Sequence, residues 1–167
     1  MPAKTAIYGV LCDTGFLIRI NKTNDPLHPL ARQYFKFFTK GGHQLFVSTI
    51  ALAEYAVKDR IEHLPMKYFR VVPFNIDHAQ RAGDFMAATL PERKESLANV
   101  TPRAIIPNDT KLFAQADVTG AITHYLTADD ACGKIYAAIS TVHQPRFQII
   151  SLRVPPQQTF GYLDLDE

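Results

Sequence analysis

The stretch IYGVLCDT at residues 7–14 decides the fold of this chain. Its first six residues form an apolar run with the length and composition of a buried strand, and the carboxylate of Asp13 follows at once. Asp129 follows a shorter apolar stretch, HYLTA at residues 124–128, in the same way. In an open parallel sheet, the ends of the strands and the starts of the following helices share one edge, where ligands bind. We therefore expect Asp13 and Asp129 to lie at that edge.

Short apolar runs alternate with helical patterns along the rest of the chain, which is typical of βαβ units around a parallel sheet. Besides the two strands above, we expect strands at 44–48, 70–74 and 147–152, and helices at 14–20, 28–40, from about 49, at 77–90, from 107 and at 130–142. The pattern predicts an α/β fold, a three-layer α/β/α sandwich with a central parallel sheet of four to five strands. We expect one domain at residues 1–155, a loop with room for a helical turn at 91–106, and an extended C-terminal tail at 156–167.

Composition limits the class of protein. The 167 residues are 47% hydrophobic, which suits one domain with a substantial core. The net charge of +2 argues against a general nucleic-acid coat, although metal ions at an acidic site would supply positive charge locally. No apolar stretch reaches the ~20 residues of a membrane span, and the N-terminus lacks a secretory pattern, so we expect a cytoplasmic protein. Cys12 and Cys132 are too few for a disulfide framework and are interpreted as core thiols.

Two further acids, Glu54 and Asp109, fall in the first turns of segments that look helical. Carboxylates gathered at one place repel each other unless a hard cation joins them, and Mg²⁺ prefers oxygen ligands. The four acids together therefore predict a divalent-metal site, whereas the six histidines show no zinc-ligand spacing. Taken singly, Glu54 could be a solvated helix residue and Asp109 a helix N-cap. Asp117 is interpreted as a surface or turn residue.

The motifs around these four acids resemble, in order, the acidic motifs of PIN-domain ribonucleases. The likeness is closest to the toxin components of bacterial and archaeal toxin–antitoxin pairs, and it runs from about residue 7 to residue 152. The matching segments are LCDT at 11–14, STIALAE at 48–54, ND at 108–109 and TADD at 127–130. The resemblance implies a PIN-like sandwich that cleaves RNA with Mg²⁺ or Mn²⁺. It makes Asp13, Glu54, Asp109 and Asp129 the catalytic and metal-binding acids.

The resemblance also implies supporting residues and partners. Thr127 would hydrogen-bond a carboxylate or a water, Thr14 would support the first acid, and Asp130 would be an accessory ligand or a helix cap. Lys111 is the cation that we expect near the acids. An antitoxin protein and a homodimer are implied partners. The sequence departs from the family pattern at Gly15, where Asn or Ser is more common.

Other functions stay open or are disfavoured. A non-catalytic PIN-like module that binds RNA or protein is the alternative to a ribonuclease. The Asp-Thr-Gly tripeptide at 13–15 also occurs in aspartic proteases, but those enzymes are all-β and need two such aspartates. Metal-dependent phosphatases of other α/β families usually carry a second aspartate two residues after the first, where Gly15 stands here. Six basic residues either line an RNA path or are scattered surface charge: Arg19, Lys22, Lys58, Arg60, Lys67 and Arg70.

Overall fold

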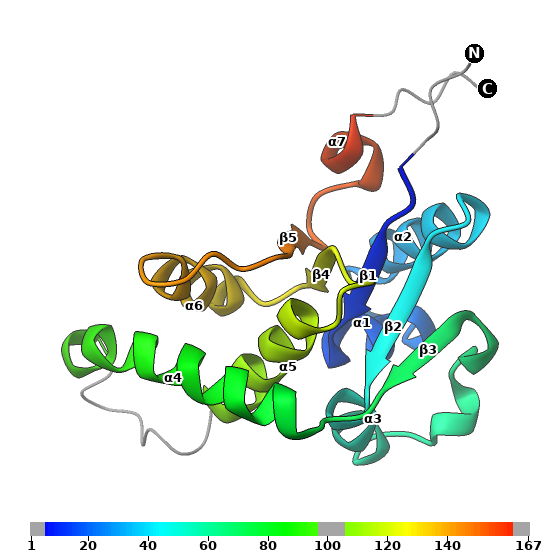
Figure 1. Ribbon diagram of the computed structural model, residues 1–167. Coiled ribbons are helices and arrows are strands. Elements are labelled where there is room, and N and C mark those ends of the chain that lie inside the picture. The colour runs from blue at the N-terminus through cyan, green and yellow to red at the C-terminus, as the bar shows by residue number, and fades with distance from the viewer. Residues whose placement is uncertain (1–5, 97–105, 162–167) are drawn as a thin grey trace.

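A five-stranded parallel sheet forms the centre of the molecule, in the strand order β3-β2-β1-β4-β5. The computed structural model describes residues 6–96 and 106–161 (Figure 1). The strands are β1 (Gly9–Cys12), β2 (Gln44–Ser48), β3 (Phe69–Val72), β4 (His124–Thr127) and β5 (Gln148–Ser151). The three-layer α/β architecture predicted from the sequence is confirmed, with strands within about two residues of their expected bounds.

Seven α-helices connect and cover the strands in the described part of the chain. They are α1 (Thr14–Asn21), α2 (His28–Lys40), α3 (Thr49–Ala56), α4 (Ile76–Ser96), α5 (Ile106–Val118), α6 (Asp130–Ser140) and α7 (Pro156–Phe160). Two short 3₁₀ turns, Ile61–His63 and Met66–Tyr68, lead from α3 into β3. Helix α1 packs against α2 and α3, whereas α4 packs against α5 and α6. These two groups lie on opposite faces of the sheet, as right-handed crossovers require (Figure 1). Within the described residues, no helix has both the length and the apolar character needed to cross a membrane.

The direction of the chain through the sheet reverses between β1 and β4. From β1 the chain moves outward to β2 and β3, then returns to pair β4 with the other side of β1. Leu11 lies opposite Phe46 of β2 and opposite Tyr125 of β4. Such a reversal opens a crevice at the carboxyl ends of the two strands, because the connections leave them in opposite directions. Asp13 and Asp129 follow these two strands, so the fold delivers both acids to the crevice.

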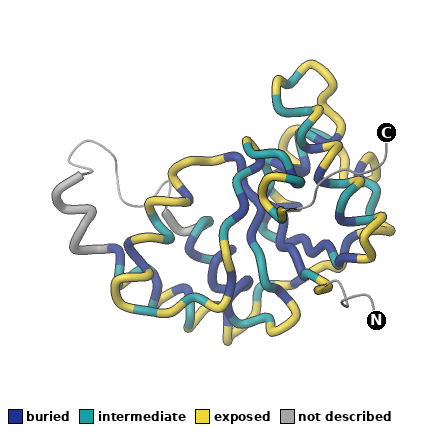
Figure 2. Tube along the Cα trace, turned by 90° about the horizontal axis from the view of Figure 1, so that it is seen from above, coloured by how far each residue is buried: buried dark blue, intermediate teal, exposed yellow. Residues whose placement is uncertain are grey.

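Burial explains why β1 occupies the centre. All four residues of β1 are buried, and Figure 2 shows buried segments running through the middle of the trace with exposed ones around them. Gly9 is required by a close backbone approach, since a Cβ built there would lie only 1.8 Å from the Ala121 carbonyl oxygen. An apolar strand packed on both faces is the expected pattern for a parallel sheet with helices on both sides.

Aromatic rings cover the opposite, amino edge of the sheet, where the strands begin. Five residues make up this amino-edge cluster: Tyr8, Phe37, His43, His124 and Phe160. Tyr8 stacks on His43 and on Phe160, each with ring centroids 4.9 Å apart. Phe160 belongs to α7, so the helix docks the C-terminal segment onto the sheet edge. The expectation of an extended tail from residue 156 is therefore wrong for Pro156–Phe160; residues 162–167 lie outside the described part.

Two further expectations need correction. Helix α4 continues through Pro91 to Ser96, where we expected a loop, while residues 97–105 of that segment lie outside the described part. Asp117, expected at the surface, is only 4% exposed. It accepts hydrogen bonds from Arg81 Nε and from the Arg146 N–H, both at 2.7 Å. Because these partners lie 36 and 29 residues away in the chain, local sequence around Asp117 gave no sign of them.

Candidate active site

Asp13 lies at the carboxyl end of β1 and caps the N-terminus of α1. Its Oδ1 accepts a hydrogen bond from the Phe16 N–H at 2.7 Å, and its Oδ2 accepts one from the Thr127 hydroxyl at 2.5 Å. The residue is only 9% exposed. Burial raises the pKa of the Asp13 carboxyl above its usual range, although both hydrogen bonds and the charge of Arg19 act to lower it. Asp13 is thus a buried acid whose position is fixed on both oxygens.

Thr127 links the first acid to the last. It is buried at the end of β4, donates its hydroxyl proton to Asp13, and accepts the Asp129 N–H at 3.0 Å. Asp129 in turn caps α6, because its Oδ1 accepts the Ala131 N–H at 2.8 Å. A single hydroxyl therefore fixes the relative positions of two acids that follow different strands and lie far apart in the chain.

Glu54 is held by uncharged donors from two other elements. Its Oε2 accepts a hydrogen bond from the Thr14 hydroxyl of α1, and its Oε1 accepts one from Asn108 Nδ2 of α5 at 2.5 Å. Glu54 is half-buried and is the sixth residue of α3. The helix begins at Thr49, as expected, so the sixth residue lies in the second turn, and the expected place of Glu54 in the first turn is wrong. The second turn places its carboxylate where α1 and α5 can reach it.

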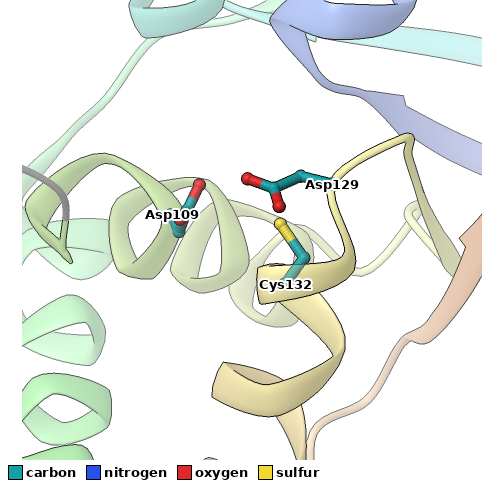
Figure 3. A group of neighbouring side chains, drawn as sticks. All are labelled: Asp109, Asp129 and Cys132. Carbon is teal, nitrogen blue, oxygen red and sulfur yellow. The ribbon is translucent and has the colours of Figure 1, made fainter. Parts of the chain in front are cut away.

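Asp109 lies in the first turn of α5, as expected, and faces Asp129. Ligand atoms of Asp109, Asp129 and Cys132 all lie within 4.8 Å of one another. Figure 3 shows the three side chains pointing toward one another from α5, from the loop before α6 and from the first turn of α6. Burial, reinforced by the negative charge of Asp109, raises the pKa of the Cys132 thiol. The thiol therefore stays protonated near neutral pH, and a neutral thiol is a poor ligand for a hard cation.

All four acids line one cleft of about 460 Å³ at the carboxyl edge of the sheet. Asp130, half of a 3.6 Å ion pair with Arg153, also lines it. Among the described lining residues the cations are Arg19 and Arg153, while the half-buried Lys111 is not one of the lining residues. The cleft therefore combines a group of carboxylates with two guanidinium groups at its border.

The donors around the acids suit a divalent cation. Among the side chains that the structure describes, at residues 6–89 and 108–161, no Lys, Arg or His nitrogen lies within 4 Å of the carboxylates of Asp13, Glu54 or Asp129. The negative charge is thus held by hydroxyl, amide and backbone donors, which orient a carboxylate without neutralising it. Oxygen ligands fixed in this way, each with lone pairs to spare, are the ligands that Mg²⁺ and Mn²⁺ prefer. The residues present fit such an ion.

Comparison with known proteins adds to this geometry. The fold is similar to that of a chain from Rickettsia felis VapBC2 bound to a DNA fragment from its promoter, with a TM-score of 0.57 and 13% identity over 86% of this chain and 98% of that one. It is also similar to a chain of DNA-bound VapBC from Salmonella typhimurium, with a TM-score of 0.53 and 14% identity over 87% and 99% of the two chains. No protein-family model matches the sequence, and no curated protein matches it either. The likeness shows the fold, which is the PIN-like fold that the sequence motifs implied.

Sequence reasoning missed two residues that the structure brings to the acids. Asn108 was interpreted only as a neighbour of Asp109, yet its side chain holds Glu54. Cys132 was interpreted as a core thiol, and it is buried, but it also borders Asp109 and Asp129. Its position three residues after Asp129, in the first turn of a helix, was the available signal, since residues at that spacing share one helix face.

Proposed function

We propose that this protein is a metal-dependent endoribonuclease that hydrolyses RNA phosphodiester bonds in the cleft formed by Asp13, Glu54, Asp109 and Asp129. The observation that carries the proposal is the convergence of four acids, from four separate segments, on one cleft at the crevice between β1 and β4. The acids are oriented by neutral donors, and this leaves their charge available to a cation.

In this proposal the four carboxylates would hold Mg²⁺ or Mn²⁺, and the ion would supply a water of lowered pKa and stabilise negative charge on the attacked phosphate. Thr127 keeps the Asp13 carboxylate in place, while Thr14 and Asn108 do the same for Glu54. Such fixed orientation matters because a ligand shell that needs no rearrangement costs less free energy to assemble. Arg19 and Arg153 place positive charge at the border of the cleft, where it attracts the substrate phosphate.

The test measures cleavage of labelled RNA in Mg²⁺ or Mn²⁺, in EDTA, and with Asp13→Asn. We expect cleavage to need the metal and to fall at least ~100-fold in the variant, because a site built for charge loses an anionic ligand. Asp77→Asn is the matched control, since Asp77 is an exposed aspartate in the first turn of α4, and it should cleave at the wild-type rate. Cleavage that persists in EDTA and in Asp13→Asn would contradict the proposal. RNA binding without cleavage under every condition would favour the non-catalytic binding module instead.

We further propose that the protein is the toxin of a toxin–antitoxin pair and acts in the cytoplasm as a homodimer. The similarity in fold to chains of two VapBC complexes supports the toxin–antitoxin role, while the homodimer follows only from the resemblance in sequence motifs and the cytoplasmic location only from the sequence pattern. Expression in a bacterial host should arrest growth, and Asp13→Asn should abolish the arrest. Co-expression of a small protein encoded next to this chain should restore growth and bind it at a fixed ratio. Light scattering of the purified chain tests the dimer, which a monomeric mass would exclude.

A further inference from the structure

Three of the six basic residues considered as an RNA path come together in the structure. Arg19, Lys22 and Lys58 line a second cleft of about 410 Å³, which we call the basic side cleft. Lys22 follows the last residue of α1, and Lys58 lies two residues beyond the end of α3. These two helices pack against each other, so their C-terminal ends bring the lysines to one surface.

The other basic residues behave differently. Arg60 places its Nη2 2.7 Å from Glu62 Oε2, and Lys67 holds its Nζ 5.0 Å from the centroid of the Tyr68 ring. By contrast, among the side chains described at residues 6–89 and 108–161, neither Lys22 nor Lys58 makes a salt bridge, and both are exposed. These two lysines therefore present positive charge that no carboxylate among those side chains neutralises by direct contact.

The basic side cleft is continuous with the acidic one. Thr14, Gly15, Arg19 and Glu54 line both. At Gly15, a Cβ would lie 2.9 Å from Arg19 Nη1 and 3.3 Å from Asp13 Oδ1. Any larger residue there would crowd the guanidinium and the first acid. The glycine that departs from the family pattern thus keeps the passage between the two clefts open.

Arg19 is held in place at this passage. Its Nε donates to Asp25 Oδ1 at 3.1 Å, and its Nη1 donates to the Gly15 carbonyl oxygen at 3.1 Å. A hydrogen bond from the Leu27 N–H, together with the charge of Arg19, holds the pKa of the Asp25 carboxyl below its usual range, so this carboxylate stays ionised at neutral pH. A guanidinium has five N–H donors, and these two bonds leave the others for a ligand.

We propose that the basic side cleft binds the backbone phosphate that neighbours the scissile one on an RNA strand leaving the acidic cleft. The inference rests on the proposed function, because it is the adjoining phosphodiester site that makes an RNA strand the occupant. In this arrangement Arg19 lies between the two phosphates, while Lys22 and Lys58 contact the outer one. The positive charge of these three residues offsets the repulsion between the RNA backbone and the nearby acids.

The first experiment measures binding in the Asp13→Asn background, so that the substrate survives. Fluorescence anisotropy compares a labelled dinucleotide, which has no outer phosphate, with a longer RNA oligonucleotide. Lys22→Ala/Lys58→Ala should raise the Kd for the longer RNA roughly tenfold and make the slope of log K against log salt less negative by about 0.7, the value for one lost phosphate contact. The loss of affinity for the dinucleotide should be clearly smaller.

The matched control is Lys36→Ala/Lys40→Ala, which removes the same charge from two exposed lysines of α2. It should change the Kd for the longer RNA by less than about twofold, because charges outside the path act only through the screened field of the whole protein. If both double variants weaken binding equally, or if the salt slope stays at the parental value, the basic side cleft is not a phosphate site. Circular dichroism establishes that both variants are folded.

The second experiment measures cleavage kinetics of the two double variants in the wild-type background. Lys22→Ala/Lys58→Ala should raise KM for the longer RNA by a similar factor. If wild type cleaves RNA and the kinetics of both variants match it, the proposed function stands and this inference fails. If wild type cleaves nothing but the length-dependent binding loss is still seen, the phosphate site stands and the proposed nuclease fails.

Discussion

At the carboxyl edge of the sheet the chain leaves a cleft of about 460 Å³ lined by carboxylates, whereas at the amino edge it stacks aromatic rings against one another. Phe37 and Phe160 stack with centroids 5.1 Å apart, and His124 packs edge-on against Tyr8 at 4.9 Å. The first arrangement concentrates like charge, which opposes folding, and the second buries apolar area, which favours it. The same five strands therefore support a costly site at one edge with a stabilising cluster at the other.

This contrast implies that substitutions at the two edges separate activity from stability. A change at the amino edge should lower the free energy of unfolding and leave cleavage by the folded molecule unchanged. A change at the carboxyl edge should abolish cleavage and leave the fold as stable as before, or more so. Each prediction below tests one side of this division.

The largest effect is expected at Gly9, where β1 begins. Gly9→Ala places a methyl group 1.8 Å from the Ala121 carbonyl oxygen, a contact that only backbone movement in the central strand can relieve. We expect a loss of more than ~4 kcal/mol of stability, seen as insoluble protein or a collapse of the urea midpoint. Gly83→Ala is the control, because Gly83 lies in α4 with nothing within 4 Å of its built Cβ. That change should stabilise the protein by about 0.5–1 kcal/mol. Equal midpoints for the two variants would refute the close approach.

Asp13 tests the carboxyl edge through the stability of the metal-free protein. Its folded-state pKa is raised, so its contribution favours folding at low pH and is lost as the pH rises through that pKa. At neutral pH the ionised form therefore opposes folding, and Asp13→Asn should raise the melting temperature of the metal-free protein by about 2–4 °C, or ~1 kcal/mol. Calorimetry in EDTA measures this directly.

The same variant should respond less to added Mg²⁺. Wild type gains stability as the ion binds the folded state, and the gain grows with concentration. Asp13→Asn should show a smaller shift because it has lost an anionic ligand. If the variant is less stable than wild type in EDTA, yet Mg²⁺ raises its melting temperature by as much as that of wild type, Asp13 is a structural residue only.

Phe160 tests the amino edge, where we expect a moderate loss of stability. Phe160→Ala removes the ring that stacks on Tyr8 and Phe37, and we expect a loss of about 1–3 kcal/mol in urea unfolding with an unchanged cleavage rate per folded molecule. Ile76→Ala, at a side chain 86% exposed, is the control and should change stability by less than ~0.5 kcal/mol. Loss of cleavage in folded Phe160→Ala would show that the two edges are coupled.

The smallest effect is the pH dependence of the stability that the amino-edge cluster contributes. Burial lowers the pKa of His43 and of His124, and the charge of His43 lowers that of His124 further. The unfolded chain therefore binds protons more readily, so the stability contributed by these groups is complete above the ordinary histidine pKa of about 6.5 and is lost as the pH falls below it. His43 Nδ1 also accepts the Tyr8 N–H at 3.0 Å, a bond that protonation of Nδ1 would break.

Urea midpoints between neutral and mildly acidic pH measure this dependence. His43→Asn retains an acceptor but does not titrate, so its midpoint should fall less than that of wild type, by the equivalent of roughly 1 kcal/mol or less. Parallel curves for the two proteins would exclude His43 as a source of the dependence.

The sequence was sufficient for features set by local pattern. The bounds of β2 and α2 agree with the apolar runs and helical spacing, and Asp13 and Asp129 lie at strand ends where abrupt changes in polarity predicted them. Prediction from the sequence failed where the deciding contacts join residues that are distant in the chain. The hydrogen bond from Asn108 to Glu54 spans 54 residues, and the ion pair of Arg81 with Asp117 spans 36.

Two residue types, a proline and a glycine, also misled the prediction from sequence. Pro91 and the charged residues after it suggested a loop, but α4 continues to Ser96. A proline inside a helix removes one backbone hydrogen bond and crowds the preceding turn, so the local sequence argued against the helix that the structure has there. Gly15 was noted only as a departure from the family pattern, whereas the geometry gives it a role through the space that it leaves beside Arg19.

The Thr127–Asp13 hydrogen bond joins residues that are 114 positions apart, and β4 supplies both Thr127 and the approach to Asp129. During translation, a ribosome-bound chain that has not yet released β4 cannot assemble the cleft, however well its first three strands have folded. Synthesis itself thus delays the appearance of the acidic centre until the segment that contains β4 and Asp129 has emerged. A cell that makes this protein meets the complete site only after that segment has left the ribosome.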